Sequence, residues 1–370
     1  MASDAWVVLP KGRGPSRLAA GLPHTVPGPR VEVDEGSSPL SARIIVRSGS
    51  ALFVVSCLLA PANRAAGQSI MLKPRLEVGQ KYYVEKHRDF TQKAGELGTR
   101  FRTVNGAIEE VKAVSEEGIE LLVTLERCAY YGNEPFHPQS FETDLGDERQ
   151  SLLLRPILRT MIGSKLTLKL NQDFDAGSCT GADKILRKIE KKAARNDMWI
   201  GIFKGAVRDD AYLDDWGREC FLLYPNREVK VGETWNKSHE EKNPELGRLR
   251  HDYRMTLKSV EEKEGRAIAV VTFSEEISKT GDSRGGDYVF RSGEVTGSAT
   301  FDSKLGRWVT CERRFTESLE GEAPRGSGRL TRVDLWAADK IDFFSLKERE
   351  AQRDARRRGT AEPPTTAPGK

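Results

Sequence analysis

The side chains best suited to acid–base chemistry are few in this chain of 370 residues, which holds five histidines. Four of them, His87, His137, His239 and His251, lie beyond the first seventy residues. A nucleophilic hydrolase needs a nucleophile, a base and a group that orients the base, and the G-x-S-x-G motif is absent. His251 and Asp252 are neighbours on an expected strand, so their side chains point to opposite faces. We therefore predict no catalytic residues and no enzyme.

Candidates for metal or phosphate binding are equally weak. Asp209, Asp210, Asp214 and Asp215 supply the oxygen ligands that suit Ca²⁺, but the order of a calcium loop is missing. On a helix these carboxylates would repel one another, so a solvated acidic face is the better interpretation. His137 lies in a proline-flanked segment, where a solvated turn is favoured over a ligand. The sequence predicts no metal site and no cofactor.

The five cysteines indicate neither a zinc ribbon nor a thioredoxin-type site, because no two of them form a C-x-x-C pair. Removal of an export signal would leave four, which allow three pairings. One or two disulfides are compatible with an oxidising compartment, and free buried thiols are equally compatible. The residues concerned are Cys57, Cys128, Cys179, Cys220 and Cys311.

Aromatic side chains give the best case for ligand binding. Ligand pockets favour apolar and aromatic walls, and two related segments, "VGQKYY" and "VGETW", each place an aromatic residue on a strand after a turn. The alternative is that these residues are ordinary core anchors. The candidates for lining a cleft are Tyr82, Tyr83, Trp199, Trp235 and Trp308, with Trp216 nearby.

The elements that must position these residues are mainly strands. Ile119, Leu121, Val123 and Leu125 alternate with polar residues, which is typical of a half-buried antiparallel strand. We expect a first β half over 68–147 and a second over 225–344. Between them, 148–224 should be a helical insert with a strand, and 345–370 a charged, then Pro/Thr-rich tail with a fraying helix and disorder.

The insert carries both helical and helix-breaking signals. Ile185, Leu186, Ile189 and Ala193 fall on one face of an expected amphipathic helix. In the preceding run, "ERQSLLLRPILRTMIG", Pro156 should end or kink a helix. We expect further short helices in "DMWIGIFKGAV" and "AYLDDWGREC".

The two β halves repeat three blocks in the same order. "LEVGQKYYVEK" matches "VKVGETWNKSH", and "EEVKAVSEEGIELLVTLE" matches "MTLKSVEEKEGRAIAVVTFSE". "GSKLTLKLNQDFDAGSC" matches "GSATFDSKLGRWVTC", so that Cys179 and Cys311 correspond. Shared alternation alone is weak evidence of a repeat, but collinearity favours a duplicated meander. Its two parts should pack face to face or join edge to edge.

An apolar run near the start indicates export. "SGSALFVVSCLLAPANRAAGQ" follows Arg43 and Arg47 and ends in small residues, as secretory signals do, and its apolar part is shorter than the ~20 residues of a membrane span. We expect a signal peptide over 43–67, cleaved near Gln68, with lipidation at Cys57 as a weaker alternative. Residues 1–42 lack periodicity and are expected to be disordered or to precede the true translation start.

Composition limits the kinds of partner. The 59 basic and 55 acidic residues give a net charge of +4, and 38% of residues are hydrophobic. No strong field would attract nucleic acid, and no other long apolar run suggests an integral membrane domain. The basic "RDARRR" segment lacks the context of a specific polyanion site.

The sequence resembles a bacterial family of exported proteins that is defined only as a domain of unknown function. The resemblance rests on five segments in order: Val78–Tyr82, Ile157–Asp175, Thr180–Ile189, Pro225–Trp235 and Gly297–Arg307. It implies a β-rich body, in some members like that of lipoprotein carriers, and supplies no catalytic residues. This chain departs from the family pattern at Gly177, which comes slightly later than the family's usual turn glycine.

Together these patterns predict an α+β protein with strongly twisted antiparallel sheet, a duplicated meander and a central helical insert. We expect a non-enzymatic periplasmic or extracellular protein that binds a hydrophobic or lipid-like ligand between the curved sheet and the helices. The alternatives are a protein-binding scaffold that uses sheet edges and, less favoured, a hydrolase. The partners, the ligand's identity and the oligomeric state are left open by the sequence.

Overall fold

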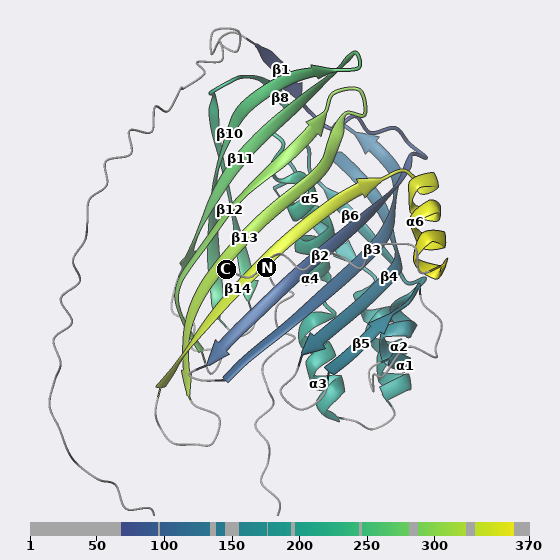
Figure 1. Cartoon of the computed structure of the whole chain (residues 1–370), viewed down its shortest axis with the longest axis vertical. Coiled ribbons are helices and arrows are strands. Elements are labelled where there is room, and N and C mark those ends of the chain that lie inside the picture. Colours follow the sequence, from purple (N-terminus) through teal and green to yellow (C-terminus); the bar gives the residue numbers. More distant parts are fainter. Residues whose placement is uncertain are drawn as a thin grey trace, which may run out of the picture. The chain divides into compact units, whose positions relative to one another are not determined.

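A 12-stranded antiparallel sheet forms the body of the protein (Figure 1). The computed structural model describes residues 68–94, 97–133, 138–144, 155–175, 177–193, 197–243, 246–280, 288–322 and 330–358. Neighbouring strands follow the order β7-β6-β4-β3-β2-β14-β13-β12-β11-β10-β9, and β5 pairs with β4 beside this path. A separate two-stranded ribbon joins β1 and β8. The predicted α+β class with antiparallel sheet is confirmed.

The strands of the first half are β1 (Ser69–Leu72), β2 (Lys81–Ala94), β3 (Leu97–Ser115), β4 (Gly118–Asn133), β5 (Pro138–Glu142), β6 (Lys165–Leu170) and β7 (Gly177–Thr180). Those of the second half are β8 (Arg227–Lys230), β9 (Thr234–Asn243), β10 (Gly247–Lys263), β11 (Arg266–Lys279), β12 (Tyr288–Asp302), β13 (Arg307–Glu322) and β14 (Leu330–Phe344).

The alternation seen in the sequence fixes which face of each strand is buried. On β4, Ile119, Leu121, Val123 and Leu125 are all buried, while the residues between them are partly exposed. Successive side chains of a strand point to opposite faces, so one face of the sheet carries the core. Residues 148–224, expected to be a helical insert with one strand, hold both β6 and β7, which extend the sheet of the first half.

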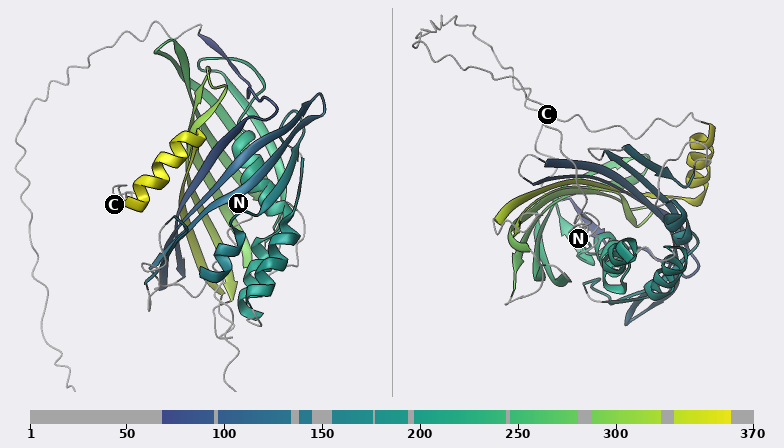
Figure 2. Two further views of the ribbon diagram at one scale, coloured as in Figure 1. Left: turned by 90° about the vertical axis from the view of Figure 1, so that its right-hand side faces the viewer. Right: turned by 90° about the horizontal axis from the view of Figure 1, so that it is seen from below.

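The helices of the insert lie on the concave side of the curved sheet (Figure 2). They are α1 (Arg155–Met161), α2 (Ala182–Ala193), α3 (Asp197–Ala206), α4 (Asp209–Tyr212), the π-helix η4 (Leu213–Arg218) and α5 (Glu219–Phe221). The predicted amphipathic face of α2 is confirmed, since Ile185 and Ile189 are buried. None of the helices in the described ranges is long and apolar enough to span a membrane.

The prediction that Pro156 ends a helix is wrong, because α1 continues past it to Met161. The residues before Arg155, on which the alternative of a kink depends, lie outside the described residues.

Strand register supports the duplication. In the first half, Val111, Leu121, Leu168 and Cys179 lie opposite one another across β3, β4, β6 and β7. In the second half, the corresponding row across β10, β11, β12 and β13 is Leu257, Val271, Ala299 and Cys311. All eight residues are buried, and a register shift follows Val111 and Leu257 alike. The halves join edge to edge, with β14 between β13 and β2.

The same turn geometry precedes the first strand of each repeat. Gly79 and Gly232 have φ of 86° and 88°. Gly79 N–H donates to the Val111 carbonyl at 2.8 Å, and Gly232 N–H donates to the Leu257 carbonyl at 2.8 Å. A positive φ of this kind favours glycine, which explains why both copies of the block contain it.

We expect alanine at Gly79 and at Gly232 to cost nearly the same free energy of unfolding. A Cβ atom has room at both sites, so the cost is the backbone strain alone, about 1–2 kcal/mol, and the double variant should show the sum. Gly98→Ala, at an ordinary φ in β3, is the control. Urea denaturation of the wild type and of these four variants measures the costs. Costs that differ by more than ~0.5 kcal/mol would contradict the shared geometry.

The C-terminal helix α6 (Leu346–Arg358) is docked on the sheet rather than fraying into a tail. Arg349 is buried and forms two hydrogen bonds with Asp144, at 2.9 and 3.0 Å. Arg356 also donates to Asp144, at 3.0 Å. The ring of Tyr83 lies 4.7 Å from the guanidinium of Arg349. Residues 359–370 of the expected tail lie outside the described residues.

The late glycine of the β6–β7 hairpin leaves its register intact. Phe174 takes the turn conformation, with φ of 59°, and Leu170 pairs with Gly177. A Cβ atom at Gly177 would lie 2.2 Å from the Lys169 carbonyl oxygen, so the glycine permits close approach of the two strands. The cysteines at 128, 179, 220 and 311 are buried and free.

Candidate ligand-binding site

A pocket of about 750 Å³ lies beside β1, at the end of the sheet where the turns β3–β4, β6–β7 and β12–β13 meet. This volume falls within the roughly 300–1,000 Å³ typical of ligand sites. Residues from five segments line it, within 70–76, 114–119, 172–174, 225–226 and 301–306. Both repeats therefore contribute to its walls.

The segments that precede the first strand of each repeat, 69–76 and 225–231, are called the lead-in segments here, and they pair with each other beside this pocket. β1 and β8 pair antiparallel, with Leu72 opposite Arg227. Arg75 N–H donates to the Gly306 carbonyl in the second repeat at 2.8 Å, and the Asn226 side chain donates to the Gln172 carbonyl in the first repeat at 2.5 Å. Each lead-in segment thus binds a turn of the other repeat.

Gly306 makes one of these contacts possible. Its φ is 63°, and a Cβ atom there would lie 2.3 Å from the Arg75 Cβ atom. Any larger residue would push the 73–76 segment away from the β12–β13 turn.

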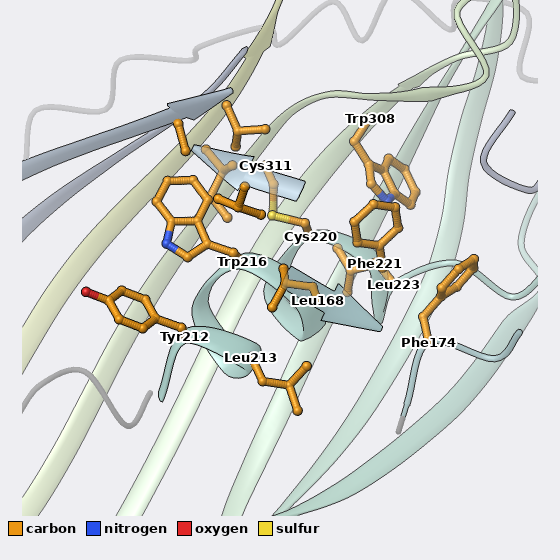
Figure 3. Packing of buried hydrophobic residues seen from close by; sticks show 14 of the residues in the cluster. Leu168, Phe174, Tyr212, Leu213, Trp216, Cys220, Phe221, Leu223, Trp308 and Cys311 are labelled. Carbon is orange, nitrogen blue, oxygen red and sulfur yellow. The ribbon is translucent and has the colours of Figure 1, made fainter. Parts of the chain in front are cut away.

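The apolar wall of the pocket continues into the hydrophobic core. Phe174 and Phe301 line the pocket and are buried. Phe174 contacts Phe221, with ring centroids 5.3 Å apart (Figure 3). Phe301 contacts Trp308, with ring centroids 5.5 Å apart. Tyr224 lies between the two, 6.1 Å from both Phe174 and Phe301. Its hydroxyl accepts a hydrogen bond from Trp308 N–H at 3.0 Å, which holds this aromatic layer in place.

The mouth of the pocket exposes apolar and cationic side chains. Met71 is 54% exposed and Val114 is 46% exposed, and both line the pocket. Large exposed apolar side chains that share one site often mark a binding surface. Lys73 and Arg75 also line it, on the same exposed side of the segment as Met71.

Among the aromatic residues singled out from the sequence, those whose side chains the structure describes do not line this pocket. Tyr82, Trp235 and Trp308 are buried in the core, and Trp308 lies one layer behind the pocket wall. Tyr83 points to the opposite face of the sheet, toward α6. Trp199 lies in α3, and its side chain is outside the described part of the structure. The alternative interpretation, that these residues are ordinary core anchors, is therefore correct for Tyr82, Trp235 and Trp308. Aromatic side chains are suited to that role because they bury large apolar areas.

A second notable feature is a row of buried charges on the concave face. Arg313, Asp339 and Arg88 lie opposite one another on β13, β14 and β2. Arg88 donates to Asp339 at 2.9 Å, and Arg313 donates to Asp339 at 2.7 Å. Glu219 of α5 accepts from Arg313 at 2.7 Å and from Lys86 at 2.9 Å.

The environment of Glu219 fixes its charge. Burial opposes ionisation, but Arg313, Lys86 and Arg88 together hold the pKa of Glu219 well below its usual range. The Lys86 ammonium also lies 4.9 Å from the Trp216 ring. These contacts attach α5 and the π-helix to the sheet through charge as well as apolar packing.

Two histidines lie side by side on β9 and β10, and no local sequence pattern indicates their carboxylate partners. His239 and His251 stack with ring centroids 4.6 Å apart. His251 Nδ1 lies 2.6 Å from Glu275 and its Nε2 lies 3.3 Å from Glu241. Burial disfavours a charged His251, but these carboxylates raise its pKa overall. Burial and the neighbouring His251 lower the pKa of His239 to about 2.

This histidine cluster links the edge strand β9 to β10 and β11, because His251 of β10 lies between Glu241 of β9 and Glu275 of β11. His251 is only 1% exposed. His87 pairs with Glu85 at 3.0 Å. His137, Cys57 and the signal segment 43–67 lie outside the described residues.

The aspartates of 209–215 serve local structure. Asp209 accepts the Ala182 N–H at the start of α2, at 3.0 Å, and Asp210 pairs with Arg208 at 2.8 Å. Asp214 is buried and pairs with Arg218, so the expected solvated face is wrong at this position. Within the described ranges, no group of three His, Cys, Asp or Glu side chains could hold a metal ion.

Comparison with solved structures finds only distant likenesses. A lipovitellin structure described for its lipid–protein interactions is 8% identical, with a TM-score of 0.39, covering 73% of this chain and 25% of that chain. An outer membrane channel from Pseudomonas putida F1 is 7% identical, with a TM-score of 0.19, covering 74% and 98%. OpdQ of Pseudomonas aeruginosa is 7% identical, with a TM-score of 0.16, and the match covers 72% of this chain and 99% of that chain. Such low scores do not establish a shared fold.

The chain spans about a quarter of the lipovitellin chain that it matches. No curated protein matches the sequence. A family model does match, over residues 121–307, from β4 through the turn that leads into β13. This match covers half of the chain and includes the 157–175, 180–189, 225–235 and 297–307 segments on which the resemblance rests. The chain belongs to this family, which is a family of unknown function (DUF6263).

Proposed function

We propose that this protein is a non-enzymatic binding protein that takes up a hydrophobic, lipid-like ligand in the pocket beside β1. The observation that carries the proposal is a pocket of about 750 Å³ with buried aromatic side chains on its wall and exposed apolar side chains at its mouth. Apolar surface that faces water favours an apolar ligand, by roughly 25 cal/mol per Å² buried. The sequence analysis expected the ligand between the sheet and the helices, whereas the pocket that supports this proposal lies at the end of the sheet.

A neutral fluorescent probe tests the proposal. N-phenyl-1-naphthylamine, which brightens in apolar surroundings, should bind the protein with a saturable rise in fluorescence. Val114→Trp should fill the mouth and weaken binding by about tenfold or more, an energy of ~1.4 kcal/mol. Val289→Trp is the matched control, because Val289 is 42% exposed and does not line the pocket. Equal weakening by both variants, or no saturable binding, would contradict the proposal.

We further propose that the protein works outside the cytoplasm. The support is the segment Ser48–Gln68, with arginines before an apolar run and small residues after it. Sequencing the N-terminus of the natural protein from envelope and secreted fractions should give a start near Gln68. Recovery of the uncleaved chain from the cytosolic fraction alone would contradict export.

The alternative function is a protein-binding scaffold that uses sheet edges. β9 and β7 end the sheet and each pairs with one neighbour within it, and an open edge can accept an added strand. Exposed side chains at Asn236, Ser238 and Glu240 face away from the core on β9. Proline at Ser238 should abolish capture of a partner from envelope extract while leaving probe binding unchanged.

A further inference from the structure

We infer that the pocket beside β1 selects amphipathic ligands with an anionic head, held at the mouth by Lys73 and Arg75. This inference rests on the proposed function and specifies the class of ligand. The shared chemistry is an oxyanion, carboxylate or phosphate, on an aliphatic chain.

The position of the two cations follows from the alternation of one extended segment. Leu72 and Pro74 are buried, while Met71, Lys73 and Arg75 between and beside them are exposed. All three exposed residues line the pocket. The backbone of the segment is held at both ends, by pairing of Leu72 with Arg227 and by the bond from Arg75 N–H to Gly306. Two positive charges are thus kept at the mouth, beside an apolar side chain.

These charges have no internal role in the part of the chain that the structure describes. Neither Lys73 nor Arg75 forms an ion pair with a described residue. Asp173 is the one acidic residue among the described residues of the lining, and its backbone carbonyl accepts a hydrogen bond from Lys237 Nζ at 2.5 Å. Two cations against one carboxylate leave the lining with a net positive charge.

Both cations come from the first lead-in segment. Among the described residues, the second repeat contributes only uncharged residues to the lining, namely Pro225, Asn226, Phe301, Ser303 and Gly306.

Lysine and arginine donate strong, charge-assisted hydrogen bonds to carboxylate and phosphate oxygens. The apolar wall at Ile70, Phe174 and Phe301 would receive the aliphatic chain. An amphipathic anion could therefore pair its head with Lys73 and Arg75 and bury its aliphatic chain against this wall.

Calorimetric titration of the full chain with four twelve-carbon probes tests the inference. The probes are dodecanoate, dodecyl phosphate, dodecanol and dodecyltrimethylammonium, the three ions below their micelle concentrations and dodecanol below its solubility limit. We expect both anions to bind at least about tenfold more tightly than dodecanol, and the cation to bind most weakly. Tighter binding of dodecyl phosphate than of dodecanoate assigns a phosphate head, and the reverse order assigns a carboxylate. Inorganic phosphate alone should not displace either anion, which separates a lipid head from free phosphate.

The double variant Lys73→Gln, Arg75→Gln should lose the tenfold preference and keep its affinity for dodecanol. Lys258→Gln, an exposed lysine of β10 outside the pocket, should behave like the wild type. Dodecanol binding as tightly as dodecanoate, or an unchanged anion affinity in the double variant, would overturn the inference while leaving the pocket in place. Failure of all four probes to bind would instead overturn the proposed function.

Discussion

Glu219→Gln should lower the free energy of unfolding by about 3–5 kcal/mol at pH 7, the cost typical of breaking a buried ion pair. The substitution keeps the shape of the side chain but removes the charge that faces Lys86, Arg88 and Arg313. Asp339 would then remain as the ion-pair partner of Arg88 and Arg313, and Lys86 would lose its ion pair with Glu219. Chemical denaturation followed by tryptophan fluorescence measures the loss.

A neighbouring glutamate supplies the control for this variant. Glu312 precedes Arg313 on β13 but points to the exposed face, so Glu312→Gln should change stability by less than ~0.5 kcal/mol. The low pKa of Glu219 means that its contribution is present above the ordinary carboxyl pKa and is lost as the pH falls further. The two variants should therefore converge in stability in strong acid. A loss below ~1 kcal/mol for Glu219→Gln at pH 7 would show that α5 is held mainly by apolar packing.

Glu109→Gln should stabilise the protein progressively as the pH rises. Burial raises the pKa of Glu109 to about 7, against the opposing effects of Tyr82, Lys86 and Arg307. The folded state thus keeps a proton that the unfolded state has already released, and wild-type stability falls as the pH rises from the ordinary carboxyl pKa to 7. Between pH 5 and 8 the difference between variant and wild type should change by about 2–3 kcal/mol.

The second repeat offers a matched test of the same position. In the second repeat Trp235 pairs with Met255, just as Tyr82 pairs with Glu109 in the first. The second repeat therefore has an apolar side chain, that of Met255, at the position that corresponds to Glu109. Glu109→Met should follow the same pH course as Glu109→Gln. Denaturation curves with parallel pH dependence for wild type and both variants would contradict a raised pKa at this site.

Local patterns were enough to predict the elements and their repetition. The alternation of apolar and polar residues in 119–125 correctly predicted the buried face of β4. The spacing of Ile185 and Ile189 correctly predicted the buried face of α2. The glycines at 79 and 232 marked equivalent turns because a positive φ restricts the choice of residue. Pro156 was expected to end a helix, but α1 continues past it to Met161, because proline in a sequence does not by itself decide on which side of it a helix lies.

The pocket and the buried charges could not be predicted in the same way. The walls of the pocket come from segments that are as far apart in the sequence as Lys73 and Ser303. No local sequence pattern indicates that β1 pairs with β8. Glu219 sits in "DDWGREC", which looks like an exposed acidic turn, and its burial depends on cations from β2 and β13. Trp308 was assigned to a cleft because an aromatic residue behind a pocket wall and one on it share the same sequence context.

The pocket itself is tested most directly by a crystal structure of the protein with 12-bromododecanoate. The account predicts an anomalous bromine signal beside Phe174 and Phe301, with the carboxylate within hydrogen-bonding distance of Lys73 or Arg75. Bromine located elsewhere on the protein, with this pocket holding only water in a complex that binds in solution, would contradict it.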